Sequence, residues 1–308
     1  MIVQLLKQQN CFGIQPKLQT FWENEIRLKA DLHLHTTASD GLLNPFQVVD
    51  LTVKSGLKAI SITDHDTVDG YLAVREYASE KGIHLVCGAE ITTDFKGREC
   101  HILAYDFDLE HPAFSKMLTG QRGIRRVRAN EIVSKLNKLG FDLDINEVQA
   151  ESGKATISRN HIAAALQRKR FVTTKREAFD RYLHSKGPAY VTNNYPEVCS
   201  VIKLIRDAGG VSILAHPGKS YIYADLKYFM DAGLDGIEYL HPSHSYLLQK
   251  KYKEYAVNYG LLLSGGSDFH GSKPHEEQYL GTICVDMEKL DKILELSCKR
   301  KISIETQS

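Results

Sequence analysis

Residues 31–41 of this 308-residue chain read DLHLHTTASDG, and this stretch is the most informative one for the fold. Its first half alternates leucine with aspartate or histidine, which is typical of a β-strand, because successive side chains of a strand point to opposite faces. His33 and His35 therefore point to the same side. Two such histidines are a weak metal-binding signal on their own, since histidines also occur in cores and on surfaces. The interpretation depends on whether the rest of the chain repeats the pattern.

Two further fragments place the same residue types at the close of apolar runs. SITDHDT at 61–67 contains His65, and SGGSDFHG at 264–271 contains Asp268 and His270, again two residues apart. Similar residues lie beside other apolar runs: Glu90, His101, His216 and His241. Imidazole and carboxylate groups gathered at strand ends are ligands for several divalent cations. The sequence therefore predicts a metal site built from several strands.

Short apolar strands alternate with amphipathic helical stretches through most of the chain. The expected strands are Ile26–Leu34, Ala59–Thr63, His84–Ile91, His101–Tyr105, Gly210–Ala215, Gly236–Leu240 and Leu261–Gly266. The expected helices are Phe46–Ser55, Gly70–Lys81, Glu197–Asp207, Leu226–Ala232 and Ser245–Tyr259. This alternation indicates parallel βα units, and in a β/α barrel the carboxyl ends of the strands carry the chemistry. His101 opens its strand instead, which predicts that this strand runs the other way or lies at an irregular rim.

A basic segment interrupts the alternation. Residues 119–190 hold 15 Lys and Arg against 7 Asp and Glu, which leaves 24 against 31 in the remainder. Helices are expected here at Gly123–Leu139, Arg159–Arg168 and Phe179–His184. We interpret 119–190 as a helical insertion over the carboxyl mouth of a barrel formed by 25–118 and 191–308, with 1–24 as an extension of unknown role. Such charge asymmetry suits an anionic substrate beside an acidic metal site, or simply solvated helix surfaces.

Composition and cysteine spacing limit the class of protein. The chain is 43% hydrophobic and 25% charged, as is ordinary for a globular protein. Its six cysteines are scattered without a CxxC pair, which favours reduced thiols over a disulfide framework or a zinc ribbon. No apolar run approaches the length of a membrane span, and the first residues lack the pattern of a signal peptide. We therefore expect a cytoplasmic protein that does not bind membranes, and the sequence predicts no particular oligomeric state.

Taken together, the motifs resemble those of the PHP family, named for polymerase and histidinol phosphatase. The resemblance rests on DLHLHTTASDG, SITDHDT, GAEITT at 88–93, HILAYDF at 101–107, LAHPG at 214–218 and SGGSDFHG. Within the family, the chain is most similar to stand-alone phosphoesterases acting on nucleotides, because Asp40 stands where histidinol phosphatases tend to carry another histidine. The resemblance implies an α/β fold, a distorted (β/α)7 barrel, that holds three divalent cations.

The resemblance also assigns nine ligands to these cations. His33, His35, Glu90 and Asp268 would hold the first. Glu90 would bridge to the second, which His101 and His216 complete, and Asp40, His65 and His270 would hold the third. The residue types agree with this assignment, since mixed nitrogen and oxygen ligands suit Mn²⁺, Fe²⁺ or Zn²⁺ better than Mg²⁺ or Ca²⁺. We expect Mn²⁺.

Catalytic and substrate-binding residues are expected around this cluster. Asp40 and His65, together with His244 as a proton-transfer residue, form the expected catalytic set. The expected substrate-binding set is Arg159, His161, Lys219 and His241. Arg159 and His161 begin an expected helix, where a guanidinium and free backbone N–H groups favour phosphate. The alternative for each of these residues is an ordinary surface or packing role.

The expected function is metal-dependent hydrolysis of nucleotide phosphoesters by activated water. Two versions remain open: removal of the 3′-phosphate of a 3′,5′-bisphosphonucleoside, and 5′→3′ trimming of short, single-stranded 5′-phosphorylated RNA. The alternatives are a histidinol-phosphate-type phosphomonoesterase, an amidohydrolase-like hydrolase and, least favoured, a non-catalytic nucleotide-binding module. GxSxG and GxxxxGK[ST] motifs do not occur, so acyl transfer at a serine elbow and P-loop hydrolysis are poorly supported.

Overall fold

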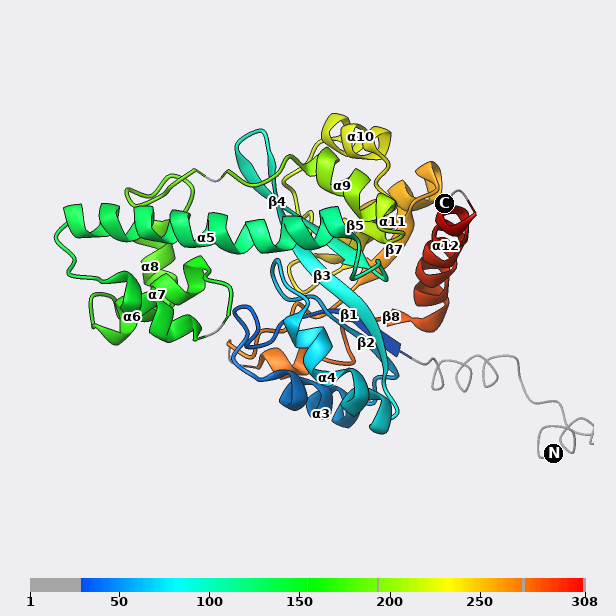
Figure 1. Ribbon diagram of the computed structural model, residues 1–308, viewed down its shortest axis with the longest axis horizontal. Helices are drawn as coiled ribbons and strands as arrows, with labels where there is room; N and C mark the ends of the chain where they lie inside the picture. The colour runs from blue at the N-terminus through cyan, green and yellow to red at the C-terminus, as the bar shows by residue number, and fades with distance from the viewer. Residues whose placement is uncertain (1–28, 154, 193, 273–274, 307–308) are drawn as a thin grey trace, which may run out of the picture.

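The computed structural model describes residues 29–306 apart from 154, 193 and 273–274, so the extension expected at 1–24 lies outside the described residues. A mixed sheet curls into a nearly closed barrel surrounded by helices (Figure 1). Its strands lie in the order β7-β6-β5-β4-β3-β2-β1-β8. Their bounds are β1 Lys29–Leu34, β2 Ala59–Ile62, β3 His84–Phe95, β4 Arg98–Tyr105, β5 Val211–Leu214, β6 Gly236–Leu240, β7 Leu262–Gly265 and β8 Val285–Asp286. The expected α/β barrel is confirmed.

Strand β4 runs against both of its neighbours, β3 and β5, whereas β1, β2 and β3 are parallel to one another. The expectation that the strand of His101 runs the other way is therefore confirmed. β3 and β4 form a hairpin whose turn residues, Lys96 and Gly97, both have positive φ, at 54° and 76°. This geometry matches the twist of the two strands. The ladder reaches Phe95 and Arg98, so the strands predicted at 84–91 and 101–105 were too short.

The barrel nearly closes where the chain after β7 approaches β1. The backbone N–H of His35 donates to the carbonyl of Phe269 at 2.9 Å. Gly266 lies so close to β1 that an added Cβ would stand 2.5 Å from the backbone nitrogen of His33, and glycine permits this approach. Along the same edge of β1, which faces away from β2, the two-residue strand β8 pairs antiparallel with the start of β1. A strand of two residues leaves no detectable sequence pattern, and β8 was not predicted.

Helices cover the outside of the sheet and form the insertion. Their bounds are α3 Pro45–Lys54, α4 Asp69–Glu80, α5 Pro112–Lys138, α6 Ile145–Ser152, α7 Arg159–Arg168, α8 Lys175–Ala178, η1 Phe179–Leu183, α9 Val198–Asp207, α10 Tyr223–Ala232, α11 Tyr246–Tyr259, η2 Glu276–Tyr279 and α12 Met287–Glu305. The expected start of α5 at Gly123 was wrong. His111 caps the helix and Pro112 occupies its first turn, while Gly120 and Gly123 weaken the helical signal inside it.

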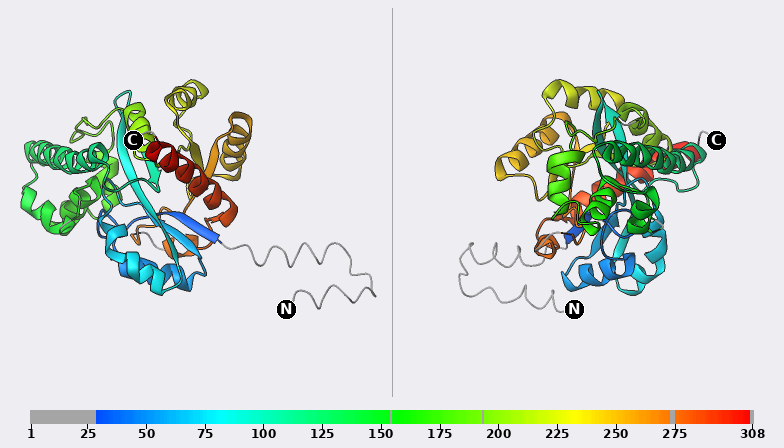
Figure 2. Two further views of the ribbon diagram at one scale, coloured as in Figure 1. Left: turned by 45° about the vertical axis from the view of Figure 1, so that its right-hand side comes forward. Right: turned by 90° about the vertical axis from the view of Figure 1, so that its left-hand side faces the viewer.

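Helix α5 belongs to the barrel at one end and to the insertion at the other. Phe114, near its start, packs in the barrel core, whereas Ile132 and Leu136 pack in a separate apolar core formed within residues 129–191. Residue 119, the expected boundary of the insertion, falls inside this helix, and the division into domains stays a prediction. Figures 1 and 2 show the insertion on the opposite side of the sheet from α12. In the described part of the chain, none of the helices combines the length and apolar character that crossing a membrane requires.

Candidate metal centre

The strands bring the nine predicted metal ligands to one mouth of the barrel. Four ligand atoms from β1, β3 and the segment after β7 form the tightest group: Nε2 of His33, Nε2 of His35, Oε2 of Glu90 and Oδ1 of Asp268. The two imidazole nitrogens lie 3.1 Å apart, and they lie 3.2–3.4 Å from the two carboxylate oxygens. His33, His35 and Asp268 each offer a ligand atom within 4.8 Å of the others, and so do His33, Glu90 and His216, so either set could hold a divalent cation. The geometry therefore fits a divalent cation.

The second oxygen of Glu90 faces another pair of imidazoles. Oε1 of Glu90 lies 2.8 Å from Nδ1 of His101 and 2.8 Å from Nε2 of His216, and these two nitrogens are 3.4 Å apart. Both oxygens of one carboxylate are thus shared between two groups of imidazoles. This arrangement suits a carboxylate that bridges two cations.

A third group surrounds Asp40, in the loop after β1. Its Oδ1 lies 3.4 Å from Nε2 of His270 and 3.9 Å from both Nε2 of His65 and Nδ1 of His35. Oδ1 of Asp40 is buried without a hydrogen-bond partner, and so is Nδ1 of His65, which lies 3.2 Å from Oε2 of Glu90 on the other side of the ring. Buried polar atoms without partners are costly, so unpaired ligand atoms at this depth fit a bound cation. The residues present therefore fit the metal cluster that the sequence predicts.

Neighbouring groups fix the imidazoles in the orientation that a ligand needs. Nδ1 of His33 faces Oε1 of Glu238 at 2.9 Å, and Nδ1 of His270 faces the carbonyl of Asp268 at 2.8 Å. Each contact places the ring proton on Nδ1 and leaves Nε2 free to bind a cation. Glu238 was not predicted. The feature that could have identified it is a single carboxylate within the apolar strand sequence GIEYL, because a buried charge requires a specific partner.

Burial and charge act in opposite directions on the ionisable groups of the cluster. Burial raises the pKa of the Glu90 carboxyl, but His65, His101 and His33 lower it more, and the result lies well below the usual range. Burial lowers the pKa of His33, whereas Glu238, Glu90 and Asp268 raise it well above the usual value. The carboxylates are therefore ionised and attract positive charge into the mouth. Protons and divalent cations compete for the same imidazole nitrogens.

Two of the predicted ligands have a left-handed backbone conformation. His216 and Asp268 have φ values of 26° and 50°, a region that residues with a Cβ seldom adopt. Each residue follows a strand, and the unusual φ lets its side chain turn back into the mouth. Strain of this kind persists where the surrounding structure holds it in place for function.

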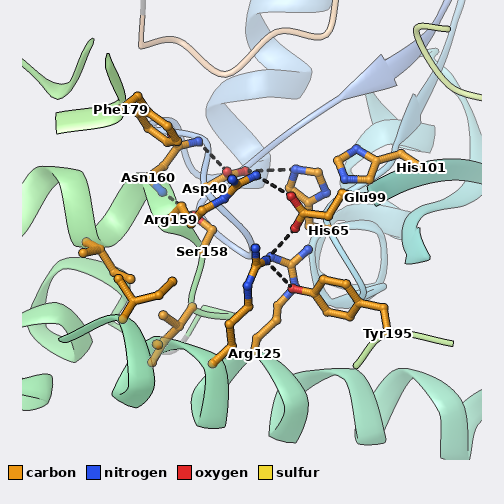
Figure 3. Close-up of a pocket in the computed structure, with 15 residues that line it drawn as sticks. Asp40, His65, Glu99, His101, Arg125, Ser158, Arg159, Asn160, Phe179 and Tyr195 are labelled. Carbon is orange, nitrogen blue, oxygen red and sulfur yellow. Dashed lines mark hydrogen bonds and ion pairs between the residues drawn. The ribbon is translucent and has the colours of Figure 1, made fainter. Parts of the chain in front are cut away.

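A cavity of about 270 Å³ leads from the cluster to the insertion (Figure 3). On the barrel side it is lined by the ligands Asp40, His65 and His101, and on the insertion side by Arg125, Arg128 and Arg159. Arg125 and Arg128 come from α5, and Arg159 begins α7. Metal ligands and guanidinium groups therefore share one cavity.

Acidic residues of the barrel hold these arginines. Nε of Arg125 lies 2.6 Å from Oδ2 of Asp66, and Nη1 of Arg128 lies 2.6 Å from Oε1 of Glu99. Arg159 pairs with the other oxygen of Glu99. Burial raises the pKa of the Glu99 carboxyl, but Arg159 and Arg128 bring it down to about 2. Glu99 and the two α5 arginines were not predicted, although Glu99 stands two residues before His101 and so shares its face of β4.

The predicted substrate-binding residues lie in different surroundings. Arg159 lines the cavity, whereas His161 turns back to accept the backbone N–H of Ser158 at 3.0 Å, which caps α7. Lys219 is exposed. Nε2 of His241 lies 3.2 Å from Oδ2 of Asp268, so His241 supports a ligand.

His244, expected to transfer a proton, is held between two backbone groups. Its Nε2 accepts the N–H of Gly218 at 3.1 Å, and its Nδ1 faces the carbonyl of Tyr239 at 3.0 Å. A proton-transfer role requires a free ring nitrogen, and both nitrogens are engaged. In this position His244 fixes the loop that carries His216.

Asn160 connects the insertion directly to the cluster. Its side-chain amide donates to Oδ2 of Asp40 at 2.7 Å, which leaves Oδ1 of Asp40 facing the histidines (Figure 3). Asn160 was not among the predicted residues, although it stands between two that were. An asparagine beside an arginine at the start of a helix gives no specific signal.

Comparisons with known proteins agree with this chemistry. The profile of the PHP domain matches residues 31–301. A 5′-3′ exoribonuclease from Haemophilus influenzae is 34% identical, and the match covers 79% of this chain and 90% of the relative. A phosphoribosyl 1,2-cyclic phosphate 1,2-diphosphodiesterase from Eggerthella lenta is 32% identical, with coverage of 78% and 94%. A 3′,5′-nucleoside bisphosphate phosphatase from Chromobacterium violaceum is 31% identical, with coverage of 78% and 86%.

A solved structure shares the whole architecture. It is described as a metal-dependent phosphoesterase from Bifidobacterium adolescentis and superposes with a TM-score of 0.80 at 31% identity. The match covers 87% of this chain and 96% of that chain. The two proteins therefore share most of their fold.

Proposed function

Because this chain belongs to the PHP domain family, we propose that it is a metal-dependent phosphoesterase that hydrolyses phosphate esters of nucleotides. The observation that carries this proposal is the cavity that joins Asp40, His65 and His101 to three arginines. A phosphate ester at the ligand cluster would meet the cations, while a second anionic group of the same substrate would reach the guanidinium groups. Guanidinium groups match the geometry of phosphate oxygens.

We propose three divalent cations, with Mn²⁺ as the first choice and Fe²⁺ or Zn²⁺ as alternatives. Such cations activate a water molecule for attack on phosphorus and neutralise charge on the phosphoryl oxygens. The chain supplies the orientation: Glu238 holds His33, His241 holds Asp268, and Asn160 holds Asp40. In this proposal Asp40 and His65 act as ligands beside the reacting phosphate, and His244 acts by fixing the loop of His216.

The substrate we propose is a ribose that carries two phosphate groups. The names of two relatives describe such molecules, since a 3′,5′-nucleoside bisphosphate and a phosphoribosyl 1,2-cyclic phosphate each bear two phosphates on one ribose. For this chain we keep two versions: removal of the 3′-phosphate of a 3′,5′-bisphosphonucleoside, and 5′→3′ trimming of short single-stranded RNA with a 5′-phosphate. Both versions use one phosphate for hydrolysis and another for binding.

A panel of substrates tests this proposal. Purified protein with Mn²⁺ is incubated with adenosine 3′,5′-bisphosphate, 5′-phosphorylated and 5′-hydroxyl oligoribonucleotides, histidinol phosphate and a small amide, and kcat/KM is compared. We expect kcat/KM for the bisphosphate, for the 5′-phosphorylated RNA, or for both, to be at least tenfold higher than for the other compounds. Preference for histidinol phosphate or for the amide would assign the protein to one of the alternative classes. Equal rates on 5′-hydroxyl RNA would remove the second phosphate from the proposal.

A further inference from the structure

We propose that Glu99 determines how tightly the cavity holds the second anionic group of its substrate. The inference rests on the proposed function, because it concerns the phosphate that is gripped and not the phosphate that is hydrolysed. Glu99 belongs to barrel strand β4 and points into the cavity from the same face as His101, two residues further along (Figure 3). It thus stands between the ligand cluster and the arginines of the insertion.

Glu99 occupies only part of the hydrogen-bonding capacity of the two arginines. Arg128 uses Nη1 for Glu99 at 2.6 Å and for the hydroxyl of Tyr195 at 3.3 Å, and it uses Nε for the carbonyl of Val191 at 3.2 Å. Its Nη2 is buried without a hydrogen-bond partner, and the whole residue is only 6% exposed. A buried guanidinium nitrogen without a partner is costly, which points to a ligand at this place in the cavity.

The charges around this nitrogen explain what Glu99 does. Arg125, Arg128 and Arg159 line the cavity, and the carboxylates of Asp66 and Glu99 pair with them, so that these five groups together carry one excess positive charge. Asp40, which lines the same cavity, faces the histidines. A phosphate at Nη2 of Arg128 would lie close to the Glu99 carboxylate, since both are bound to the same guanidinium. Like charges at this distance repel. Glu99 therefore weakens the grip on the second phosphate and allows the product, which keeps that phosphate, to leave.

Direct binding of adenosine 5′-monophosphate tests the inference. Calorimetry on the Mn²⁺-loaded protein compares adenosine 5′-monophosphate with adenosine for the wild type, Glu99→Gln and Glu99→Asp. We expect Glu99→Gln to bind the monophosphate about tenfold more tightly than the wild type, because it removes one charge at short range in a partly buried site. Adenosine should bind equally to all three proteins. Glu99→Asp keeps the charge, so its affinity for the monophosphate should stay near that of the wild type.

Asp69→Asn is the matched control. Asp69 pairs with another α5 arginine, Arg122, but that pair is half exposed and lies outside the cavity. Asp69→Asn removes one negative charge next to the same helix, as Glu99→Gln does. The affinity for adenosine 5′-monophosphate should therefore equal that of the wild type. A similar gain in Asp69→Asn and Glu99→Gln would show a general effect of net charge and would overturn the inference.

A Glu99→Gln variant that gains no affinity for the monophosphate would contradict the inference. If Glu99 only holds the two arginines in place, Glu99→Gln will bind the monophosphate as weakly as the wild type or more weakly, and the inference falls. It also falls if the wild type binds adenosine as tightly as the monophosphate. Neither result decides whether the protein hydrolyses nucleotides, because the substrate panel measures that separately. If Glu99→Gln proves unstable, Glu99→Asp still tests the inference. This variant keeps the charge and shortens the side chain, so tighter binding of the monophosphate to Glu99→Asp would show that shape and not charge limits the affinity, and the inference would fall.

Discussion

At the scale of single residues, Glu90 has the most connected position in the molecule. Its two oxygens contact different groups of imidazoles: Oε2 faces His33 and His35, and Oε1 faces His101 and His216. In the predicted assignment, removing this carboxylate affects two cation positions, whereas removing any one of these imidazoles affects one.

We predict that Glu90→Gln lowers the metal content of the purified protein and its affinity for Mn²⁺ by more than the roughly 10–100-fold that loss of a supporting residue causes. Elemental analysis of dialysed protein measures this. Glu295→Gln, an exposed carboxylate on α12, is the matched control and should keep the metal content of the wild type. Full metal content in Glu90→Gln would contradict the bridging role.

His161 provides a prediction about pH. Burial lowers its pKa from 6.5 to about 4, while the unfolded chain keeps the ordinary value. Between those two values the unfolded state binds a proton that the folded state does not, so stability falls as the pH falls from about 6.5 to about 4. The loss is at most about 3 kcal/mol. In His161→Gln, with chelator present, the free energy of unfolding should depend less on pH in this range, as measured by urea denaturation. Parallel pH curves for both proteins would refute the prediction.

The nine predicted ligands could be expected near one another from the sequence, because each lies in a short motif beside a strand, while their assignment to cations rests on the resemblance to the PHP family and stays a prediction. Other residues of the site could not be found in this way. The Asn160 contact depends on how the insertion sits over the barrel, and the Arg128 contact with Glu99 joins segments 29 residues apart. His244 was assigned by position after a strand, and sequence does not show that two backbone groups already use its nitrogens.

At the scale of elements, the sequence predicted the ranges of strands and helices correctly where apolar residues recur with a regular period. The ranges of β6 and α7 agree with the sequence pattern, whereas β3 and β4 extend further because a tight turn at Lys96 and Gly97 prolongs their pairing. Helix α5 extends further at its start because packing against the barrel compensates for two internal glycines.

Helix α7 offers a prediction about substrate binding. Its first residue, Arg159, lines the cavity, while its last residue, Arg168, pairs with Glu151 away from the cavity. Arg159→Ala should raise KM for a substrate with two phosphates about tenfold and leave metal content and kcat nearly unchanged, since a lost charged hydrogen bond weakens binding by this order. Arg168→Ala should have the KM of the wild type. Steady-state kinetics distinguish the two, and equal KM values in all three proteins would return Arg159 to a surface role.

At the scale of the whole molecule, the predicted ligand cluster gathers side chains from most of the barrel at its open mouth. The predicted ligands come from β1, β3 and β4 and from the segments after β1, β2, β5 and β7, so bound cations would tie together strands that are far apart in the sheet order. A ligand that binds only the folded state stabilises it by mass action.

Removal of the cations should therefore affect stability as well as activity. We expect a strong chelator to abolish hydrolysis and to lower Tm by roughly 5–10 °C, and Mn²⁺ to restore both. Activity assays and calorimetry on the same samples measure the two effects. Loss of activity without any change in Tm would indicate that the cations contribute to the chemistry but not to the closure of the barrel.

The continuity of α5 has a consequence for how this architecture can vary. The helix carries Gln121, Arg125 and Arg128 along one side and continues without a break into the apolar core of the insertion. Each residue of an α-helix turns the following side chains by about 100° around its axis. One residue added or deleted in the helix before Arg125 would therefore turn both arginines, together with the insertion core that forms around the later part of the helix, by about 100° relative to the barrel. The helical segment between the barrel and the insertion can therefore change in length only by whole helical turns. Insertions or deletions of other lengths are tolerated only in the loops at the far end of the insertion.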